Sequence, residues 1–192
     1  MLPFGITILD LSAYIGLAAV GLIAVNLLLG MLISMRYSPM RHWPHRHWNH
    51  FALHRWTAYL SLVTLFLHPA VLLLAARPHF RLFDLLVPIH SPLQPTINVL
   101  GAIALYLLLV VIGTSMLRHR MPRRLWRGLH YLVYPAAVLL LLHSLLTDPN
   151  LINGHPDYTD GGKVFVEITI LVVAAASYVR YRLRGKGLRP LQ

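Results

Sequence analysis

The sequence predicts an all-α membrane protein, a bundle of five transmembrane helices with its N-terminus outside and its C-terminus inside. Three observations lead to this prediction. Of the 192 residues, 57% are hydrophobic and only 12% are charged, a balance outside the usual range of soluble domains. Five apolar stretches are long enough to cross a bilayer. There are 17 Lys and Arg residues against 6 acids, and all but three of these basic residues gather on one side of the predicted bundle.

The predicted spans have the length of membrane helices, because about 20 residues at a rise of 1.5 Å cross a hydrocarbon core of roughly 30 Å. The first span is expected to be retained, since it is too long for a signal peptide and no basic residue precedes it. The whole chain, 1–192, is predicted to form one transmembrane domain with its functional core at about 48–147. The spans cover approximately residues 11–35, 52–76, 96–117, 126–147 and 164–181.

The basic residues predict the orientation of the bundle. Only Arg77, Arg81 and Lys163 fall on the side that holds the N-terminus. By the positive-inside rule the other side is cytoplasmic, and a bacterial cytoplasmic membrane is the expected location. The net charge of +11 therefore indicates orientation and contact with membrane lipid, and not nucleic-acid binding. The basic side holds Arg36, Arg41, Arg46, Arg55, Arg118, Arg120, Arg123, Arg124, Arg127, Arg180, Arg182, Arg184, Lys186 and Arg189.

Four histidines lie within predicted spans, where an ionisable side chain is costly and tends to mark function. The second span carries His54 and His68, and the fourth carries His130 and His143. A single span separates these two, so they run parallel. The histidines therefore form two level pairs, His54 with His130 near the inner face and His68 with His143 near the outer face.

Two level pairs match the ligands of two haems, because low-spin haem iron takes one neutral imidazole from each side. The 14 residues between the histidines of the second span are about 21 Å of helix, so two b-type haems would be stacked across the bilayer. The chain has no cysteine, which excludes iron–sulfur clusters and c-type haem attachment. In the fourth span, 13 residues leave the two histidines about 140° apart on an ideal helix, and Pro135 is expected to re-aim one of them.

This pattern resembles the ferric-reductase-like transmembrane domain, a superfamily that includes ferric-chelate reductases and the membrane part of NADPH oxidases. The resemblance covers about residues 48–147, including the unequal histidine spacings. It is clearest in LWRGLHYLVYPAAVLLLLH, residues 125–143, which is similar to the haem-binding membrane subunit of the bacterial periplasmic methionine sulfoxide reductase. It implies that His54, His68, His130 and His143 are axial haem ligands. That subunit has lost the ligand at the position of His54, which this chain keeps.

The predicted function is a b-type cytochrome that transfers electrons across the membrane through two bis-histidine haems. The donor would be a cytoplasmic reductase or a quinol, because a chain of 192 residues has no room for its own flavin and nicotinamide module. The outer acceptor would be ferric iron, oxygen or a periplasmic oxidoreductase, so the chain is an oxidoreductase subunit or relay. One alternative is a subunit of a methionine sulfoxide reductase-like system, which bound FMN would favour. An alternative of another class is a haem-free metal or solute transporter.

Two arginines and a histidine cluster are further candidates. Arg55 and Arg127 lie close to the inner histidines in sequence and are candidates to pair with haem propionates, although topology determination explains them as simply. The cluster of His42, His45, His47 and His50 offers metal ligands, but its Arg and Trp neighbours also fit an interfacial segment on anionic lipid.

Three polar features complete the prediction. Residues 78–90 are expected to form a short amphipathic helix in the outer interface, with His79 and His90 at its ends. Glu167 is expected to be an interfacial acid, with proton chemistry as the alternative. Asn26, within the first span, is expected to form a hydrogen bond between helices.

Overall fold

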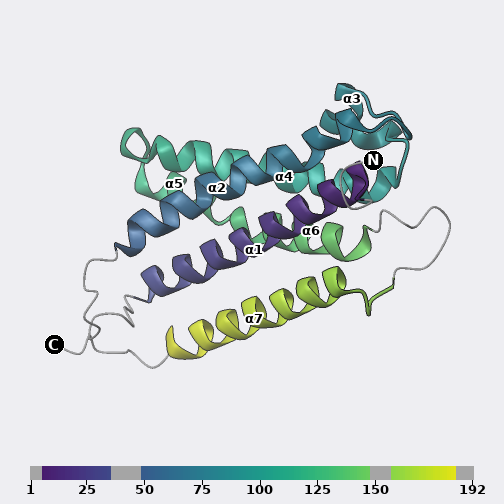
Figure 1. Cartoon of the computed structure of the whole chain (residues 1–192). Coiled ribbons are helices and arrows are strands. Elements are labelled where there is room, and N and C mark those ends of the chain that lie inside the picture. The colour runs from purple at the N-terminus through teal and green to yellow at the C-terminus, as the bar shows by residue number, and fades with distance from the viewer. Residues whose placement is uncertain (1–5, 36–48, 148–156, 185–192) are drawn as a thin grey trace.

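The computed structural model describes residues 6–35, 49–147 and 157–184, and these ranges contain helices and no strand (Figure 1). Five segments are long and apolar enough to cross a membrane, each within a few residues of its predicted place. The prediction of an all-α bundle of five membrane helices is therefore confirmed. The segments are Ile8–Ser34, His50–Leu74, Pro95–Met116, Arg123–Leu146 and Gly161–Leu183.

Three spans are single α-helices and two are composite. The single ones are α1 (Ile8–Ser34), α4 (Pro95–Met116) and α7 (Gly161–Arg184). The second span is α2 (His50–Val71), which continues into the 3-10 helix η3 (Leu72–Leu74). The fourth span is divided into α5 (Arg123–His130) and α6 (Val133–Leu146). The connections contain the short helices α3 (Leu82–Leu86), η4 (Pro88–His90) and η5 (Arg118–Arg120).

Polar caps determine where the first two spans begin. The hydroxyl of Thr7 accepts from the amide of Asp10 at 3.1 Å, and the Asp10 carboxylate accepts from the amide of Thr7 at 2.9 Å. This capping box starts α1 earlier than the apolar pattern alone predicts. The side-chain oxygen of Asn49 accepts from the amides of Phe51 and Ala52 and caps α2 in the same way.

The helices pack in two close pairs. α1 lies along α2, α4 lies along α6, and α7 packs against α1 and α6. Small buried residues, among them Ala19, Ala104 and Ala136, are fully inaccessible at these contacts and allow close approach of the helices. The histidines of α2 therefore face those of α5 and α6 across the middle of the bundle.

The two ends of the bundle differ in charge. The start of α2, α5 and the end of α7 lie together at one end, on the left of Figure 1, whereas α3 and the start of α1 lie at the other. The first end is called the basic end, and the acids Asp10, Asp84, Asp157, Asp160 and Glu167 lie towards the opposite one. The predicted N-out orientation rests on this asymmetry. Arginines of the basic end are Arg55, Arg118, Arg120, Arg123, Arg124, Arg127, Arg180 and Arg182.

The predicted amphipathic helix over 78–90 is present only in part. Its α-helical portion, α3, ends at Leu86, and a 3-10 turn follows from Pro88. The residue before a proline is disfavoured in the α region, and Val87 accordingly leaves it, with φ −132° and ψ 80°. Phe83 and Ile89 are exposed, as expected of a segment that contacts the membrane interface.

Candidate functional site

The four membrane histidines form the two predicted pairs in space. The ring centres of His54 and His130 are 6.4 Å apart with an interplanar angle of 68°. Those of His68 and His143 are 6.2 Å apart at 71°. We call these the inner and the outer pair, names that follow the predicted orientation. Each pair therefore brings together one histidine from α2 and one from the divided fourth span.

These separations suit a metal ion held between the two rings. An imidazole nitrogen binds a transition metal at about 2 Å, and the ring centre lies about 1 Å behind that nitrogen. Two axial histidines on one iron therefore have ring centres about 6 Å apart. Both pairs match this value, so the histidines fit the bis-imidazole ligation of a haem.

The break between α5 and α6 lies between the two histidines of the fourth span. Pro135 has no amide hydrogen, so the carbonyl of Tyr131, four residues earlier, lacks its usual helical donor. That carbonyl instead accepts from the amide of Tyr134 at 3.1 Å, in a tighter turn. His130 consequently ends α5, while His143 lies within α6. The fourth span is therefore interrupted at Tyr131 and Leu132, just before Pro135. That Pro135 re-aims one of the two histidines stays a prediction.

Every one of the four rings has a hydrogen-bond partner at Nδ1. His54 donates to the carbonyl of Asn26 at 3.1 Å, His68 to that of Ser12 at 2.7 Å, and His143 to that of Ile97 at 3.0 Å. A carbonyl oxygen only accepts, so in these three rings the proton is on Nδ1 and the lone pair is on Nε2. A lone pair on Nε2 is what a metal ligand needs.

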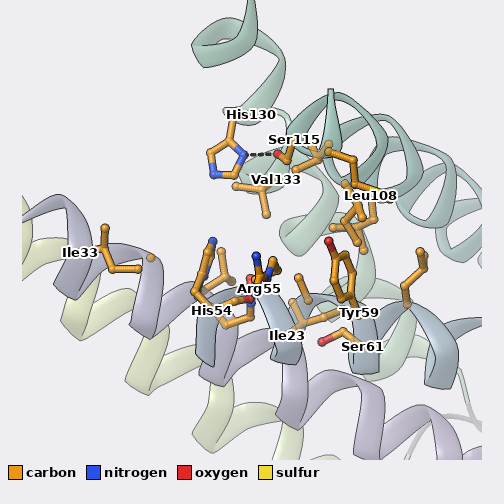
Figure 2. A pocket seen from close by; sticks show the side chains of 18 of the residues that line it. Ile23, Ile33, His54, Arg55, Tyr59, Ser61, Leu108, Ser115, His130 and Val133 are labelled. Carbon is orange, nitrogen blue, oxygen red and sulfur yellow. Dashed lines mark hydrogen bonds between the residues drawn. The ribbon is translucent and has the colours of Figure 1, made fainter. Parts of the chain in front are cut away.

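His130 has a different kind of partner. Its Nδ1 lies 3.2 Å from the hydroxyl of Ser115 on α4 (Figure 2). The hydroxyl both donates and accepts, so this bond is compatible with either tautomer of the ring. On its other side His130 stacks on Trp126, with ring centres 5.2 Å apart at 27°.

A large cavity adjoins the inner pair. It has a volume of about 680 Å³, which lies in the range of cofactor pockets. His54 and His130 approach it from opposite sides, and Tyr59 and Leu108 form part of its wall (Figure 2). The cavity adjoining the outer pair is about 80 Å³, so a macrocycle there requires the surrounding side chains, such as Leu72, to move.

Arginines of the basic end reach the large cavity. Arg55 lines it, as predicted, together with Arg118, which the sequence did not single out. Arg127, the other predicted residue, is exposed and is not among the lining residues. Trp126 also lines the cavity, and its buried indole N–H has no hydrogen-bond partner in the part of the chain that the structure describes. Two guanidinium groups and an unpaired donor suit a ligand with carboxylates.

The remaining predicted residues lie elsewhere. His42, His45 and His47 are outside the described residues, and His50 is the first residue of α2. His79 and His90 are exposed, whereas Glu167 is half-buried. Asn26 bridges α1 and α2 by donating to the carbonyl of His54 at 2.5 Å and to the hydroxyl of Thr57 at 2.7 Å. This confirms the expected bond between helices, with its acceptor on a candidate ligand.

The fold and site define an integral membrane protein whose helix bundle presents paired histidines at two levels. Its sequence matches the family model of the ferric reductase like transmembrane component over residues 15–141. The chain belongs to this family, and membership indicates a role in membrane electron transfer. The matched region contains His54, His68 and His130 and ends just before His143. Neither a curated protein nor a solved structure matches the chain.

Proposed function

We propose that this chain is a membrane cytochrome that transfers electrons across the bilayer through two b-type haems. His54 and His130 would ligate one, and His68 and His143 the other. The observation that carries this proposal is the separation of the paired ring centres, 6.4 Å and 6.2 Å, which is close to the value of about 6 Å for two imidazoles on one iron. A bound haem supplies reversible one-electron reduction at its iron.

The protein residues hold the ligands and determine the route. The Nδ1 hydrogen bonds orient the rings and leave Nε2 available at three of the four positions. The two levels are 14 residues apart on α2, about 21 Å of helix, so an electron crosses most of the hydrocarbon core in two stages. Apolar side chains between the levels, such as Leu65 and Leu140, exclude water and charged side reactants.

The basic end supports the placement of the inner haem. Arg55 and Arg118 line the large cavity beside the inner pair, as does Trp126, whose indole N–H has no partner among the described residues. These donors would bind propionates, which fixes the polar edge of the macrocycle towards the basic end.

The proposed direction of transfer rests on the family resemblance together with the charge asymmetry, because a haem conducts electrons either way. The basic end would face the cytoplasm of a bacterium by the positive-inside rule, so a cytoplasmic reductase or a quinol would reduce the inner haem. An outer acceptor, such as ferric iron, oxygen or a periplasmic oxidoreductase, would oxidise the outer haem. The chain would act as a relay or an oxidoreductase subunit.

The test is a dithionite-reduced minus oxidised absorption spectrum of the purified protein, with the haem content measured as the pyridine haemochrome. Two b-type haems per chain are expected. H54A and H130A should each remove the same haem, H68A and H143A the other, and the double variant H54A/H68A both. H90A, at an exposed position, is the matched control and should keep two.

The same preparation decides between the alternatives. A colourless wild-type chain after haem-replete expression would overturn the cytochrome and leave a transporter that uses these histidines. Bound FMN, released on denaturation and identified by its fluorescence, would favour a methionine sulfoxide reductase-like subunit as the system in which the relay works.

A further inference from the structure

We propose that α1 positions both haem ligands of α2, through one structural unit that occurs twice along the helix. The first copy is Ser12 with Gly16, and the second is Asn26 with Gly30. In each copy a polar residue clamps a histidine by its ring and its backbone, and a glycine four residues later makes room for the ring. The inference rests on the proposed function, because it concerns the ligands of the two haems.

The first copy holds His68. The carbonyl of Ser12 accepts from Nδ1 of His68 at 2.7 Å, and the hydroxyl of Ser12 donates to the His68 carbonyl at 2.7 Å. The two residues are thus joined in both directions. A Cβ placed on Gly16 would lie 3.0 Å from Nδ1 and 3.1 Å from Cε1 of the same ring, so any larger residue would displace it.

The second copy holds His54 in the same way. The carbonyl of Asn26 accepts from Nδ1 of His54 at 3.1 Å, and the amide of Asn26 donates to the His54 carbonyl at 2.5 Å. A Cβ on Gly30 would lie 3.3 Å from Cε1 of His54. The reciprocal pair of bonds and the glycine therefore recur, with Asn in place of Ser.

The two copies are in register with the ligands. Ser12 and Asn26 are 14 residues apart, as are Gly16 and Gly30, and this is also the spacing of His54 and His68. Fourteen residues are nearly four full turns, so each set returns to almost the same helix face. α1 thus repeats its contact with α2 at both haem levels, which a single chance contact between helices would not do.

α4 shows the same arrangement at one level and a departure at the other. The carbonyl of Ile97 accepts from His143, and a Cβ on Gly101, four residues later, would lie 3.0 Å from that ring. Fourteen residues after Gly101 is Ser115, whose hydroxyl contacts Nδ1 of His130 at 3.2 Å. Three ligands are thus fixed by backbone carbonyls and glycines, and His130 by a side chain.

Glycine-to-alanine variants test the proposal, with the haem content and the midpoint potential of each haem as readouts. G16A should shift the potential of the outer haem or remove that haem, and should leave the inner one unchanged. G30A should affect only the inner haem, and less strongly, because its clash is milder. G21A is the matched control on α1, since its Cβ would meet Phe165 and no histidine. G113A is the control on α4, where a Cβ meets nothing within 4 Å.

Two side-chain variants test the clamp itself. S12A should shift the potential of the outer haem alone and N26A that of the inner haem alone, with partial recovery in N26S. The unaffected haem in the same molecule shows that the variant is folded. H54A and H68A backgrounds, which retain one haem each, assign every shift to its level. Equal shifts at both levels, or no shift in G16A and S12A, would overturn the proposal.

A haem-free measurement separates this inference from the proposed function. Nitrogen-15 NMR of the full chain with labelled histidine, produced without haem, reports which ring nitrogen carries the proton. His54 and His68 should be protonated at Nδ1. If these tautomers are found but the chain binds no haem, the proposed function fails and the clamp stands. If two haems bind but the rings are protonated at Nε2 in the haem-free chain, the clamp fails and the cytochrome stands.

Discussion

The ammonium group of Lys163, on α7, donates hydrogen bonds to the backbone carbonyl of Thr147, just after the end of α6. It also donates to the carbonyl of Ser144 at 2.9 Å, and its side chain is only 6% exposed. The last carbonyls of a helix have no intrahelical donor, so Lys163 satisfies them and places a positive charge at the negative end of α6. His143 is in this same turn.

Replacing Lys163 should change both stability and redox behaviour. K163M leaves two carbonyls without this donor, and we expect a loss of about 1–3 kcal/mol in the free energy of unfolding. It also removes a cation close to the outer pair, so the outer haem should become harder to reduce. Thermal unfolding in detergent and a redox titration measure the two effects. K163R, which keeps the charge, should retain the potential, and a potential unchanged in K163M would contradict the expectation.

Arg55 should contribute to retention of the inner haem. R55Q removes a guanidinium that lines the inner cavity, and a hydrogen bond to a charged group at a partly solvated site leads us to expect roughly three- to tenfold faster haem loss. Transfer of haem to an acceptor protein gives the rate. R127Q is the control, because Arg127 is exposed like Arg55 but does not line the cavity. Equal effects of R55Q and R127Q would indicate a general effect of charge.

Pro135 should be necessary for the position of His130. P135A restores an amide donor to the carbonyl of Tyr131, so α5 and α6 can merge into one helix. On a continuous helix the ring of His130 would rotate away from His54, and the inner haem should lose its low-spin spectrum while the outer one keeps it. P69A is the control, since α2 continues through Pro69 without a break. An inner haem with an unaltered spectrum in P135A would show that contacts other than Pro135 produce the break between α5 and α6.

The orientation can be measured independently of any cofactor. Five spans put the two termini on opposite sides, and the positive-inside rule places the C-terminus in the cytoplasm. In a bacterium, a C-terminal green fluorescent protein should therefore fluoresce, and alkaline phosphatase at the same position should be inactive. An active C-terminal phosphatase would reverse the orientation and with it the proposed direction of electron transfer.

The spans and the histidine pairs could be predicted because both depend on periodicity and length. About 20 apolar residues specify a membrane helix, and parallel spans place His68 and His143 at one level. A disturbance of the fourth span near Pro135 could also be predicted, because a proline removes the donor of the carbonyl four residues before it regardless of tertiary context.

The partners of the rings could not be predicted, since they are mainly backbone carbonyls. Any residue supplies a carbonyl, so nothing in the side chain of Ile97 marks it as the partner of His143. Which arginine lines the large cavity, Arg118 and not Arg127, likewise depends on how η5 and α5 are oriented at the basic end. The pair Ser12 and Gly16 recurs 14 residues later as Asn26 and Gly30. This recurrence is the sequence signal that would have indicated that α1 contacts both histidines of α2.

The helix α5 gives the inner site a property that the outer site lacks. His130 is the last residue of a helix of eight residues that also carries Arg123, Arg124 and Arg127, whereas His143 lies in the last turn of the 14-residue helix α6. Lipid headgroups or an acidic protein surface that bound those arginines would contact α5, the same short helix that carries the ring of His130. In the proposed relay, a donor that docks at these arginines would therefore contact the same helix that carries a ligand of the first haem.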